Sequence, residues 1–321
     1  RYFESAGLDM TYLNAQSGPR AKQMLAANQL IAAVSGSNDP IALSLAGKHI
    51  LVTGCNSGLG KETLRVLALR GARVLGAARS AEKAREAAAE VGATSFAGFA
   101  CELADPRSVR ACVEAVKQDG ARLDAIVCNA GIMALPRRET AFGYELQFFT
   151  NHVGHFMLVT GLLDRLSDEG RVVMLSSAAH QGAPRATIEF DNLSGERGYT
   201  PWKAYGQSKI ANLLFAKELA RRLAGTKQTS NAVHPGVIAT NLSRHMNPIV
   251  RAVFGLSKPL FLKNEGQGAA TQVYVAVHPA VAGVSGEYFA DCNVARPRPD
   301  AEDPAIARRL WEVSEEIVAK L

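Results

Sequence analysis

The chain has 321 residues, 47% of them hydrophobic and 21% charged, which is an ordinary composition for a globular protein with a sizeable core. Its net charge of +6 comes from Lys and Arg residues scattered along the chain, whereas a nucleic-acid-binding surface needs them clustered. No apolar run approaches the roughly twenty residues of a membrane-spanning helix. We therefore expect neither a nucleic-acid partner nor an integral membrane protein, and the positive charge is left for solvent, a phosphate-rich ligand or an acidic membrane surface.

The cysteines follow no metal-binding or disulfide pattern. There are five, an odd number, without a metal-ligand spacing: Cys55, Cys101, Cys112, Cys128 and Cys292. They predict reduced thiols in a reducing compartment and no metal site. The first residue is Arg1, so either a targeting segment has been removed or the sequence begins inside a longer chain. The cytosol and an organelle such as a chloroplast or mitochondrion both fit.

Residues 1–46 contain no strong strand pattern. Lys22–Val34 is a candidate for one helix, and Ser35–Pro40 (SGSNDP) predicts a loop. We expect this segment to be an N-terminal extension that either packs on the following domain or docks on a partner.

From residue 47 to 321 short apolar runs alternate with helical periods. The runs predict strands at His49–Thr53, Arg73–Ala77, Thr94–Ala100, Leu123–Cys128, Arg171–Ser176, Thr229–Val233 and Gly286–Phe289. Helices are expected at Leu59–Arg70, Ala81–Val91, Pro106–Gln118, Tyr144–Leu166, Tyr205–Leu223 and Pro304–Leu321. This alternation favours a single doubly wound α/β domain of Rossmann type, with a parallel sheet of about seven strands and helices on both faces.

A glycine-rich loop follows the first predicted strand and opens the first helix. Its sequence TGCNSGLG occupies residues 53–60 and places glycines at 54, 58 and 60. In a dinucleotide-binding loop these glycines allow a tight turn, close approach of the main chain to a pyrophosphate, and close helix–strand packing. An ordinary glycine-rich turn is the alternative, but the strand before and the helix after the loop favour dinucleotide binding.

The end of the second predicted strand bears on the choice of dinucleotide. NAD-binding domains place an acidic residue there, about twenty residues past the glycine loop, to bind the ribose hydroxyls. This chain has Arg79 and no acidic residue at that point. A guanidinium suits a 2′-phosphate, so we expect NADP(H) in preference to NAD(H), against the alternative of an ordinary surface arginine.

Tyr205 and Lys209 lie four residues apart, early in a predicted helix, and therefore share one of its faces. A neighbouring ammonium favours tyrosinate, so Lys209 is expected to lower the pKa of Tyr205 and make it a usable acid or base. Most such pairs are exposed helix residues, so the pair alone predicts little. Ser176, Ser177 and the sequence CNAG (128–131) add weight, because they end two strands at the sheet edge where ligands bind.

Asn151 lies within a long predicted helix together with His152 and His155. Because Asn is mildly unfavourable inside a helix, a tertiary partner is expected for it. No carboxylate or cysteine set accompanies the two histidines, so they predict packing or surface roles rather than metal binding.

Together these motifs resemble the short-chain dehydrogenase/reductase family. TGCNSGLG resembles the family's TGxxxGxG, CNAG its NNAG, and HPG (234–236) its PG turn beside the nicotinamide. The branch most similar to this sequence contains retinol dehydrogenases, the WW-domain oxidoreductase and a chloroplast-envelope dehydrogenase. That likeness is carried by ELQFFTNHVGHFMLV, ELARRL, HPGVIATNL and GVSGEYFADCNVARPRPDAEDPAIARRLWEVSE, and by a long Ser177–Tyr205 interval that contains FDNL.

Three positions depart from the family patterns. Cys128 replaces the first Asn of NNAG, and Glu102 stands where an Asp often contacts the adenine. Ala211 stands where light-dependent protochlorophyllide reductases, which share the long interval, have a Cys. This last difference argues against that activity.

The resemblance implies a catalytic set of Asn151, Ser177, Tyr205 and Lys209. Tyr205 would exchange a proton with the substrate oxygen, Ser177 would orient that oxygen, and Lys209 would lower the Tyr pKa and bind the nicotinamide ribose. Asn151 would hold a water that links Lys209 to solvent. Cofactor contacts are implied for Gly54, Asn56, Ser57, Gly58, Leu59, Gly60, Arg79, Glu102, Leu103, Asn129, Ala130, Gly131, Tyr205, Lys209, Pro235, Gly236 and Val237.

Residues 240–264 fall where the family places its substrate lid. Within them RHMNPIVRAVFGLSKPLFLK (244–263) breaks the strand–helix alternation and is apolar, with basic residues at its flanks. We expect a lid over an apolar pocket, with core packing and peripheral membrane contact as alternatives.

The predicted function is an NADP(H)-dependent oxidoreductase that interconverts a carbonyl and an alcohol on a lipophilic, retinoid- or fatty-aldehyde-like substrate. The alternative is a nucleotide-binding structural or regulatory subunit that docks on a larger assembly through residues 1–46. A homodimer is compatible with either.

Overall fold

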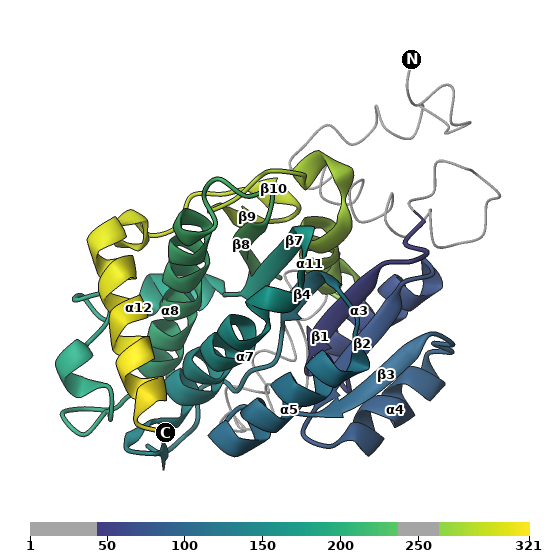
Figure 1. Ribbon diagram of the computed structural model, residues 1–321. Helices are drawn as coiled ribbons and strands as arrows, with labels where there is room; N and C mark the ends of the chain where they lie inside the picture. The colour runs from purple at the N-terminus through teal and green to yellow at the C-terminus, as the bar shows by residue number, and fades with distance from the viewer. Residues whose placement is uncertain (1–43, 237–262) are drawn as a thin grey trace. The chain divides into compact units, whose positions relative to one another are not determined.

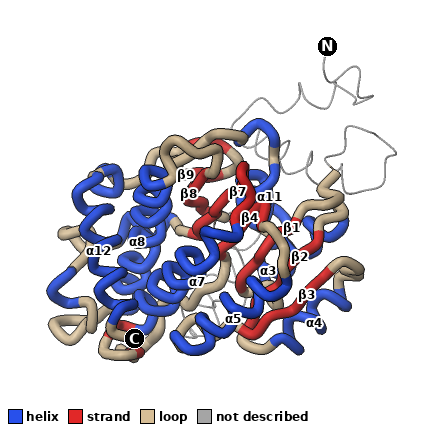
Figure 2. The backbone as a smooth tube through the Cα atoms, in the orientation of Figure 1, coloured by secondary structure: helices blue, strands red, loops and turns tan. Residues whose placement is uncertain are grey.

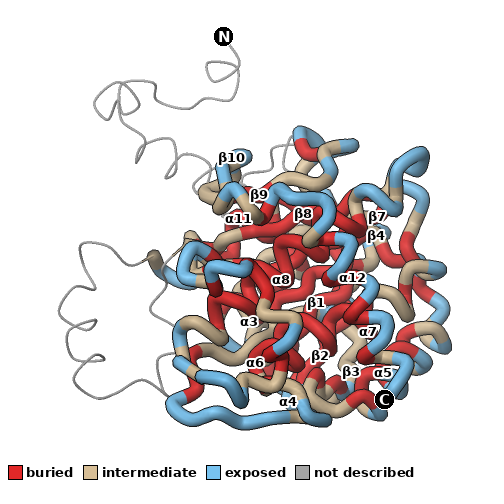
Figure 3. Tube along the Cα trace, turned by 90° about the vertical axis from the view of Figure 1, so that its left-hand side faces the viewer, coloured by how far each residue is buried: buried red, intermediate tan, exposed pale blue. Residues whose placement is uncertain are grey.

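Buried aliphatic runs form the central sheet of the computed structural model, which describes residues 44–236 and 263–321. The strands of its parallel part are β1 (His49–Thr53), β2 (Arg73–Ala78), β3 (Phe96–Ala100), β4 (Leu123–Cys128), β7 (Leu166–Leu175), β8 (Thr229–His234) and β9 (Tyr288–Ala290). β1, β4 and β8 are buried at all but one residue each, as expected for parallel strands that are covered on both faces (Figure 3).

The strand order is β10-β9-β8-β7-β4-β1-β2-β3. All neighbouring strands from β9 to β3 are parallel, and the short strand β10 (Asn293–Val294) pairs with β9 in the antiparallel sense. The chain begins in the middle with β1, moves out to β3 and returns to β4. The prediction of a doubly wound parallel sheet is confirmed, and the direction of winding changes between β1 and β4, where such folds bind ligands.

Helices cover both faces of the sheet, as Figures 1 and 2 show. One face carries α3 (Gly58–Leu69), α4 (Ala81–Glu90) and α11 (Glu265–Val277), and the other carries α5 (Pro106–Asp119), α7 (Gly154–Leu162) and α8 (Pro201–Arg222). The C-terminal helix α12 (Pro304–Ala319) packs on α8. Because the parallel strands all run the same way, their carboxyl ends and the loops that follow them meet at one edge.

Side-chain caps determine where several helices begin. Asp105 accepts a hydrogen bond from the Arg107 amide at 3.0 Å ahead of α5, and Asp303 accepts one from the Ala305 amide at 2.7 Å ahead of α12. Each of these helices starts with a proline, whose missing N–H is not needed at that position.

An aromatic cluster joins α12 to the domain. The Trp311 indole stacks on Phe215 with ring centroids 5.4 Å apart and meets Phe156 edge-on at 4.9 Å. The Arg222 guanidinium lies 4.2 Å from the centre of the Trp311 ring. These contacts bury the apolar stripe of α12 against α7 and α8.

The predicted helix Tyr144–Leu166 is wrong at both ends. Tyr144 and Glu145 form β6 and pair with β5 (Thr140–Ala141) in a hairpin. The helical stretch then runs through α6 (Leu146–Phe148), a π-helical turn (Phe149–Val153) and α7. At the other end Leu166 already belongs to β7, because it pairs with Leu123 before a shift of register to Arg171.

Helix α11 was not predicted. Its buried face is built from small residues, including Gly268, Ala269 and Ala270, and therefore has no run of large apolar side chains at helical spacing. The local signal was the capping box, in which Asn264 and Gln267 bond reciprocally with each other's main-chain amides.

Several predictions fall outside the described residues. They are the helix expected at Lys22–Val34, the cofactor contact of Val237, and the lid segment 240–264 except for its last two residues. These stay predictions. Within residues 44–236 and 263–321 no helix is long and apolar enough to cross a membrane. The same residues contain no group of three or more His, Cys, Asp and Glu side chains arranged to hold a metal ion.

Candidate active site

Tyr205 and Lys209 lie on the first turns of α8, against the carboxyl end of β7. Both side chains are buried, with 7% and 3% of their surface exposed, and the Lys209 Nζ lies 5.5 Å from the centre of the Tyr205 ring. Ser177 follows the end of β7 and hydrogen-bonds the Tyr205 side chain. The structure therefore brings the three residues together, as the sequence predicted.

The ammonium of Lys209 is hydrogen-bonded to a main-chain carbonyl. Its Nζ donates to the Leu175 carbonyl at 3.1 Å, and the Asn212 amide donates to the same oxygen at 3.0 Å. The Ser176 hydroxyl donates to the Lys209 carbonyl at 2.8 Å and so ties α8 to the end of β7. Burial lowers the pKa of Lys209 to about 8, because the ammonium loses its hydration.

Burial also acts on Tyr205, and here the prediction from sequence was wrong. Burial raises the pKa of Tyr205 to about 12, while the hydrogen bond with Ser177 acts in the opposite direction. The expected lowering by Lys209 is outweighed because the phenolate loses more hydration than its neighbours replace. At neutral pH this side chain is a phenol that carries a proton to donate.

Asn151 lies in the π-helical turn between α6 and α7. Its Oδ1 accepts from the Ile132 amide at 2.8 Å, and its Nδ2 donates to the Ile132 carbonyl and to the Ser208 hydroxyl, both at 2.9 Å. Asn151 thus has the tertiary partners that were expected for it, Ile132 and Ser208. Since Ser208 precedes Lys209, the turn is joined directly to α8.

The glycine loop packs tightly against the end of β4. Gly54 has φ 65, and a Cβ on Gly60 would meet the Gly54 carbonyl and, at 2.5 Å, the Asn129 amide nitrogen. Ser57 is the N-cap of α3 but makes no side-chain capping bond. The first-turn amides of α3 are therefore not capped by that hydroxyl and point at the sheet edge, where an anion is stabilised.

In the CNAG segment the Asn129 side chain bonds to other parts of the protein, and Gly131 lies at the carboxyl edge of the sheet. The Asn129 Nδ2 donates to the Thr53 carbonyl at 2.9 Å, and its Oδ1 accepts from Gln272 of α11 at 3.2 Å. Gly131 faces Asn151 and Lys209, since a Cβ placed there would lie 2.9 Å from the Asn151 Oδ1 and 3.5 Å from the Lys209 Nζ. Of the Asn129 contacts predicted with a cofactor, the side-chain ones are already taken by the protein.

Three further predicted cofactor residues follow β2 and β3. Arg79 comes directly after β2 and is exposed. Glu102 accepts from the Ala104 amide at 3.2 Å, and Leu103 is buried with its carbonyl against Gly154 of α7. These residues line the same edge on the far side of β1 from Tyr205, because β2 and β3 lie beyond β1 in the sheet.

Sequence reasoning missed the residues that hold the Ser177 loop. The His180 Nδ1 lies 2.6 Å from the Ser177 carbonyl, and the Arg298 amide donates to His180 Nε2 at 3.2 Å. The Arg298 guanidinium donates to the carbonyls of Ala183 and Pro184 at 2.8 and 2.6 Å. The segment before α12 therefore binds the long interval between Ser177 and Tyr205 through Arg298. Nothing in the sequence indicated that these two segments are in contact.

A second histidine joins this loop to the turn after β8. The His234 Nδ1 accepts from the Ala178 amide at 3.2 Å and from the Gly236 amide at 3.4 Å. Gly236 packs on Lys263. Pro235, which lies between His234 and Gly236 in the chain, is buried. The predicted Pro235–Gly236 turn thus lies beside the Ser177 loop.

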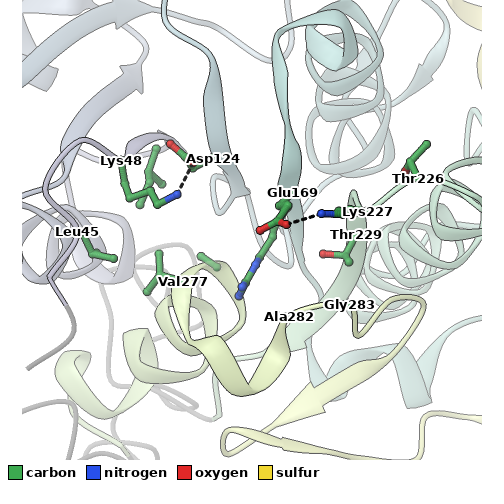
Figure 4. A pocket seen from close by; sticks show the side chains of 13 residues that line it. Leu45, Lys48, Asp124, Glu169, Thr226, Lys227, Thr229, Val277, Ala282 and Gly283 are labelled. Atoms are coloured by element: carbon green, nitrogen blue, oxygen red, sulfur yellow. Dashed lines mark hydrogen bonds and ion pairs between the residues drawn. The ribbon is translucent and has the colours of Figure 1, made fainter. Parts of the chain in front are cut away.

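The hollow drawn in Figure 4 lies at the opposite edge of the sheet. It has a volume of about 380 Å³ and is lined by Lys48, Asp124 and Thr229 at the amino ends of β1, β4 and β8, among others. Two ion pairs lie at its rim, Lys48 with Asp124 at 2.9 Å and Lys227 with Glu169 at 3.1 Å. None of the predicted site residues lines it, so we assign the candidate active site from the side chains at the carboxyl edge.

Comparison with known proteins agrees with the fold. The family described as short chain dehydrogenase matches residues 48–249. Human retinol dehydrogenase 14 is 40% identical over 86% of this chain and 87% of its own length. The chloroplastic short-chain dehydrogenase TIC 32 B of Brassica napus is 40% identical over 88% of this chain and 93% of its own.

Two solved structures show the same fold. An uncharacterized protein from Mycobacterium Paratuberculosis has a TM-score of 0.70 at 35% identity, covering 86% of this chain and 95% of that one. Angucycline C-6 ketoreductase LanV with bound NADP has a TM-score of 0.63 at 25% identity, covering 77% and 95%.

The Rossmann-type sheet and the polar cluster at its carboxyl edge define a dehydrogenase-like α/β enzyme. The chain belongs to the short-chain dehydrogenase family, and it is an oxidoreductase that acts on CH–OH groups.

Gly206→Ala is expected to impair catalysis more than folding. A Cβ at Gly206 would lie 2.7 Å from the Ala179 carbonyl and 2.9 Å from the Ala183 amide, so α8 must move away from the Ser177 loop. We expect kcat to fall by about 10–100-fold, because the distance between Tyr205 and Ser177 changes. Steady-state kinetics and a thermal melt check this.

The matched control is Gly182→Ala in the same loop, where an added Cβ meets nothing within 4 Å. This variant should retain wild-type kinetics. Equal kinetic losses in both variants would contradict the packing argument.

Proposed function

We propose that this chain is an NADP(H)-dependent enzyme that interconverts the carbonyl and alcohol forms of a lipophilic substrate, with Tyr205 as the acid and base. The observation that carries the proposal is the buried pair on α8: the Lys209 Nζ lies 5.5 Å from the Tyr205 ring centre, and Ser177 hydrogen-bonds the same phenol. Groups of this kind move a proton to or from a substrate oxygen.

The residues at the edge fit a nicotinamide dinucleotide. The α3 N-terminus offers amides for the pyrophosphate, through Gly54, Asn56, Ser57, Gly58, Leu59 and Gly60. Arg79 is exposed where a 2′-phosphate would lie, and no acidic residue replaces it, which supports NADP(H) over NAD(H). Glu102, Leu103, Ala130, Gly131, Pro235 and Gly236 complete the proposed contacts. Asn129 is limited to its main-chain carbonyl, because its side chain and its amide are bonded within the protein.

A bound nicotinamide supplies or accepts the hydride. In the direction of reduction Tyr205 donates its proton to the substrate oxygen, and the Ser177 hydroxyl hydrogen-bonds that oxygen as its negative charge develops. The Lys209 ammonium stabilises the tyrosinate that results, and it keeps two N–H groups besides the one bonded to Leu175 for the ribose hydroxyls. Asn151 holds Ser208 and so fixes the turn of α8 between the two proton-transfer residues.

A lipophilic substrate is supported by the relatives and by one exposed aromatic ring. The most similar curated relatives include retinol dehydrogenases. Trp202 is 49% exposed and meets Tyr205 edge-on, with centroids 6.1 Å apart, so an apolar substrate that reaches the phenol passes this indole.

We assign the lid to residues 240–264 and an N-terminal extension to 1–46, and we place the enzyme in a reducing compartment because its five cysteines are free.

The proposal is tested by oxidation of NADPH in the presence of a panel of apolar aldehydes and ketones. Wild-type protein should turn over at least one of them, whereas Tyr205→Phe should lose about 10²–10⁴-fold in kcat, because the phenol that donates the proton is gone. NADPH affinity, measured by fluorescence titration, should be nearly unchanged in the variant.

Two outcomes would contradict the assignment. Wild-type rates in Tyr205→Phe would remove the phenol from the mechanism. Silence across the panel, together with tight NADPH binding and co-purifying partners, would favour the alternative of a nucleotide-binding subunit.

Arg79→Ala is expected to weaken NADPH binding by about 10–100-fold, because a hydrogen-bonded charge pair with the 2′-phosphate is lost. NADH binding should change little, so the ratio of the two dissociation constants is the diagnostic quantity. Arg308→Ala is the control, since Arg308 is an exposed arginine on α12. Equal losses for NADPH and NADH in Arg79→Ala would argue against a 2′-phosphate contact.

Carbonyl reduction is expected to slow as the pH rises through about 8, because burial lowers the pKa of Lys209 to about 8. The ammonium is present below that pH and is lost above it, and with it the charge that stabilises tyrosinate. The measurement is kcat/KM on both sides of this pH, with NADPH binding followed in parallel. A rate that rises through this range would exclude Lys209 as the controlling group.

A further inference from the structure

His155 joins two parts of the site that are far apart in the sequence. Its Nε2 lies 2.9 Å from the Thr53 Oγ1 at the end of β1, and its Nδ1 lies 2.9 Å from the Asn151 carbonyl in the π-helical turn. All three residues are buried, with exposures of 0% or 1%. The imidazole is therefore a bridge from the base of the glycine loop to the turn that contacts the catalytic helix.

The neighbours determine where the protons lie. The Thr53 Oγ1 accepts from the amides of Asn129 and Ala130 at 2.9 and 3.0 Å, so its own hydrogen is free to be donated. His155 Nε2 is the near acceptor at 2.9 Å, while the Val127 carbonyl lies at 3.5 Å. The imidazole proton is then on Nδ1 and is donated to the Asn151 carbonyl, and burial keeps the ring neutral by lowering its pKa to about 4.

The π-helical turn explains why a side chain bonds to this carbonyl. In a π-turn main-chain hydrogen bonds run five residues along, as in the bond from the Gly154 amide to the Phe149 carbonyl. His155 lies four residues after Asn151, and its side chain adds a donor to that residue's carbonyl. The position of the turn thus depends on the imidazole as well as on the helix.

We propose that His155 is a positioning residue that holds the Asn151 turn in fixed register with Thr53, and hence the proton-transfer residues in register with the dinucleotide. This inference rests on the proposed function. One end of the bridge is Thr53, whose hydroxyl orients the amides of Asn129 and Ala130 beside the glycine loop. The other end is Asn151, whose amide holds Ser208 next to Lys209.

The test uses His155→Leu, which removes both hydrogen bonds and keeps an apolar side chain in the core. His152→Leu is the matched control, because His152 belongs to the same turn, is 1% exposed and hydrogen-bonds Ser314 and Asn212 rather than Thr53 or the Asn151 carbonyl. Measurements are the NADPH dissociation constant by fluorescence titration, kcat and KM, and the melting temperature.

His155→Leu is expected to lower kcat by about 100-fold and to weaken NADPH binding by about tenfold, because the reacting groups lose their register. His152→Leu should lower the melting temperature but leave kcat and NADPH affinity within about threefold of wild type, since His152 bonds neither Thr53 nor the Asn151 carbonyl. His155→Gln keeps an amide donor and a carbonyl acceptor, so it should recover much of both losses.

A double-mutant cycle with Thr53→Val separates a bridge from two unrelated effects. If Thr53 and His155 act through one hydrogen bond, the loss of NADPH affinity in the double variant is smaller than the product of the two single losses. If His155→Leu does not fold, His155→Gln and Thr53→Val carry the test, with a partial loss expected for the first and a larger one for the second.

Wild-type NADPH affinity and kcat in the His155 variants, or fully multiplicative losses in the cycle, would overturn the inference. Failure of the proposed function looks different. In that case Tyr205→Phe retains full rates, or wild-type protein binds no dinucleotide, whatever residue stands at position 155.

Discussion

A buried cation without a carboxylate partner constrains the site more than any other feature. The Lys209 ammonium is 3% exposed, and within the described part of the chain it forms no ion pair and donates one hydrogen bond, to Leu175. Such burial costs several kcal/mol unless other groups compensate, and the pKa of about 8 reflects that cost. The ammonium is stable where the Leu175 carbonyl, an adjacent phenol and ligand hydroxyls can surround it, which is the carboxyl edge of β7.

Neutral histidines hold the loops at this edge. His155 connects Thr53 with Asn151, His180 connects the Ser177 carbonyl with the Arg298 amide, and His234 accepts from Ala178 and Gly236. In all three, burial lowers the pKa, to about 4 for His155 and His234. Each ring therefore offers one donor and one acceptor at neutral pH. His155 and His180 use both, between an O–H or N–H group and a carbonyl, whereas His234 uses its acceptor for two amides.

Sequence predicted the strands and the proximity of Tyr205 and Lys209 well, because both depend on local spacing. Runs such as His49–Thr53 and Leu123–Cys128 are long, apolar and bounded by turns, and Tyr205 and Lys209 share a helix face at any degree of burial. The pKa of Tyr205 was predicted in the wrong direction because desolvation depends on the packing of distant segments. The roles of His155 and Arg298 were missed for the same reason, since their partners lie up to 118 residues away in the chain.

The clasp formed by Arg298 has a consequence for how the protein matures. The strands β1 to β8 and helix α8 all precede it in the sequence, so most of the sheet can pair while the chain is still being synthesised. The loop that carries Ser177 lacks two of its anchors, the Arg298 amide and guanidinium, until the segment that contains Arg298 has left the ribosome. A nascent chain would therefore have most of the sheet in place before the Ser177 loop gains its contacts with Arg298.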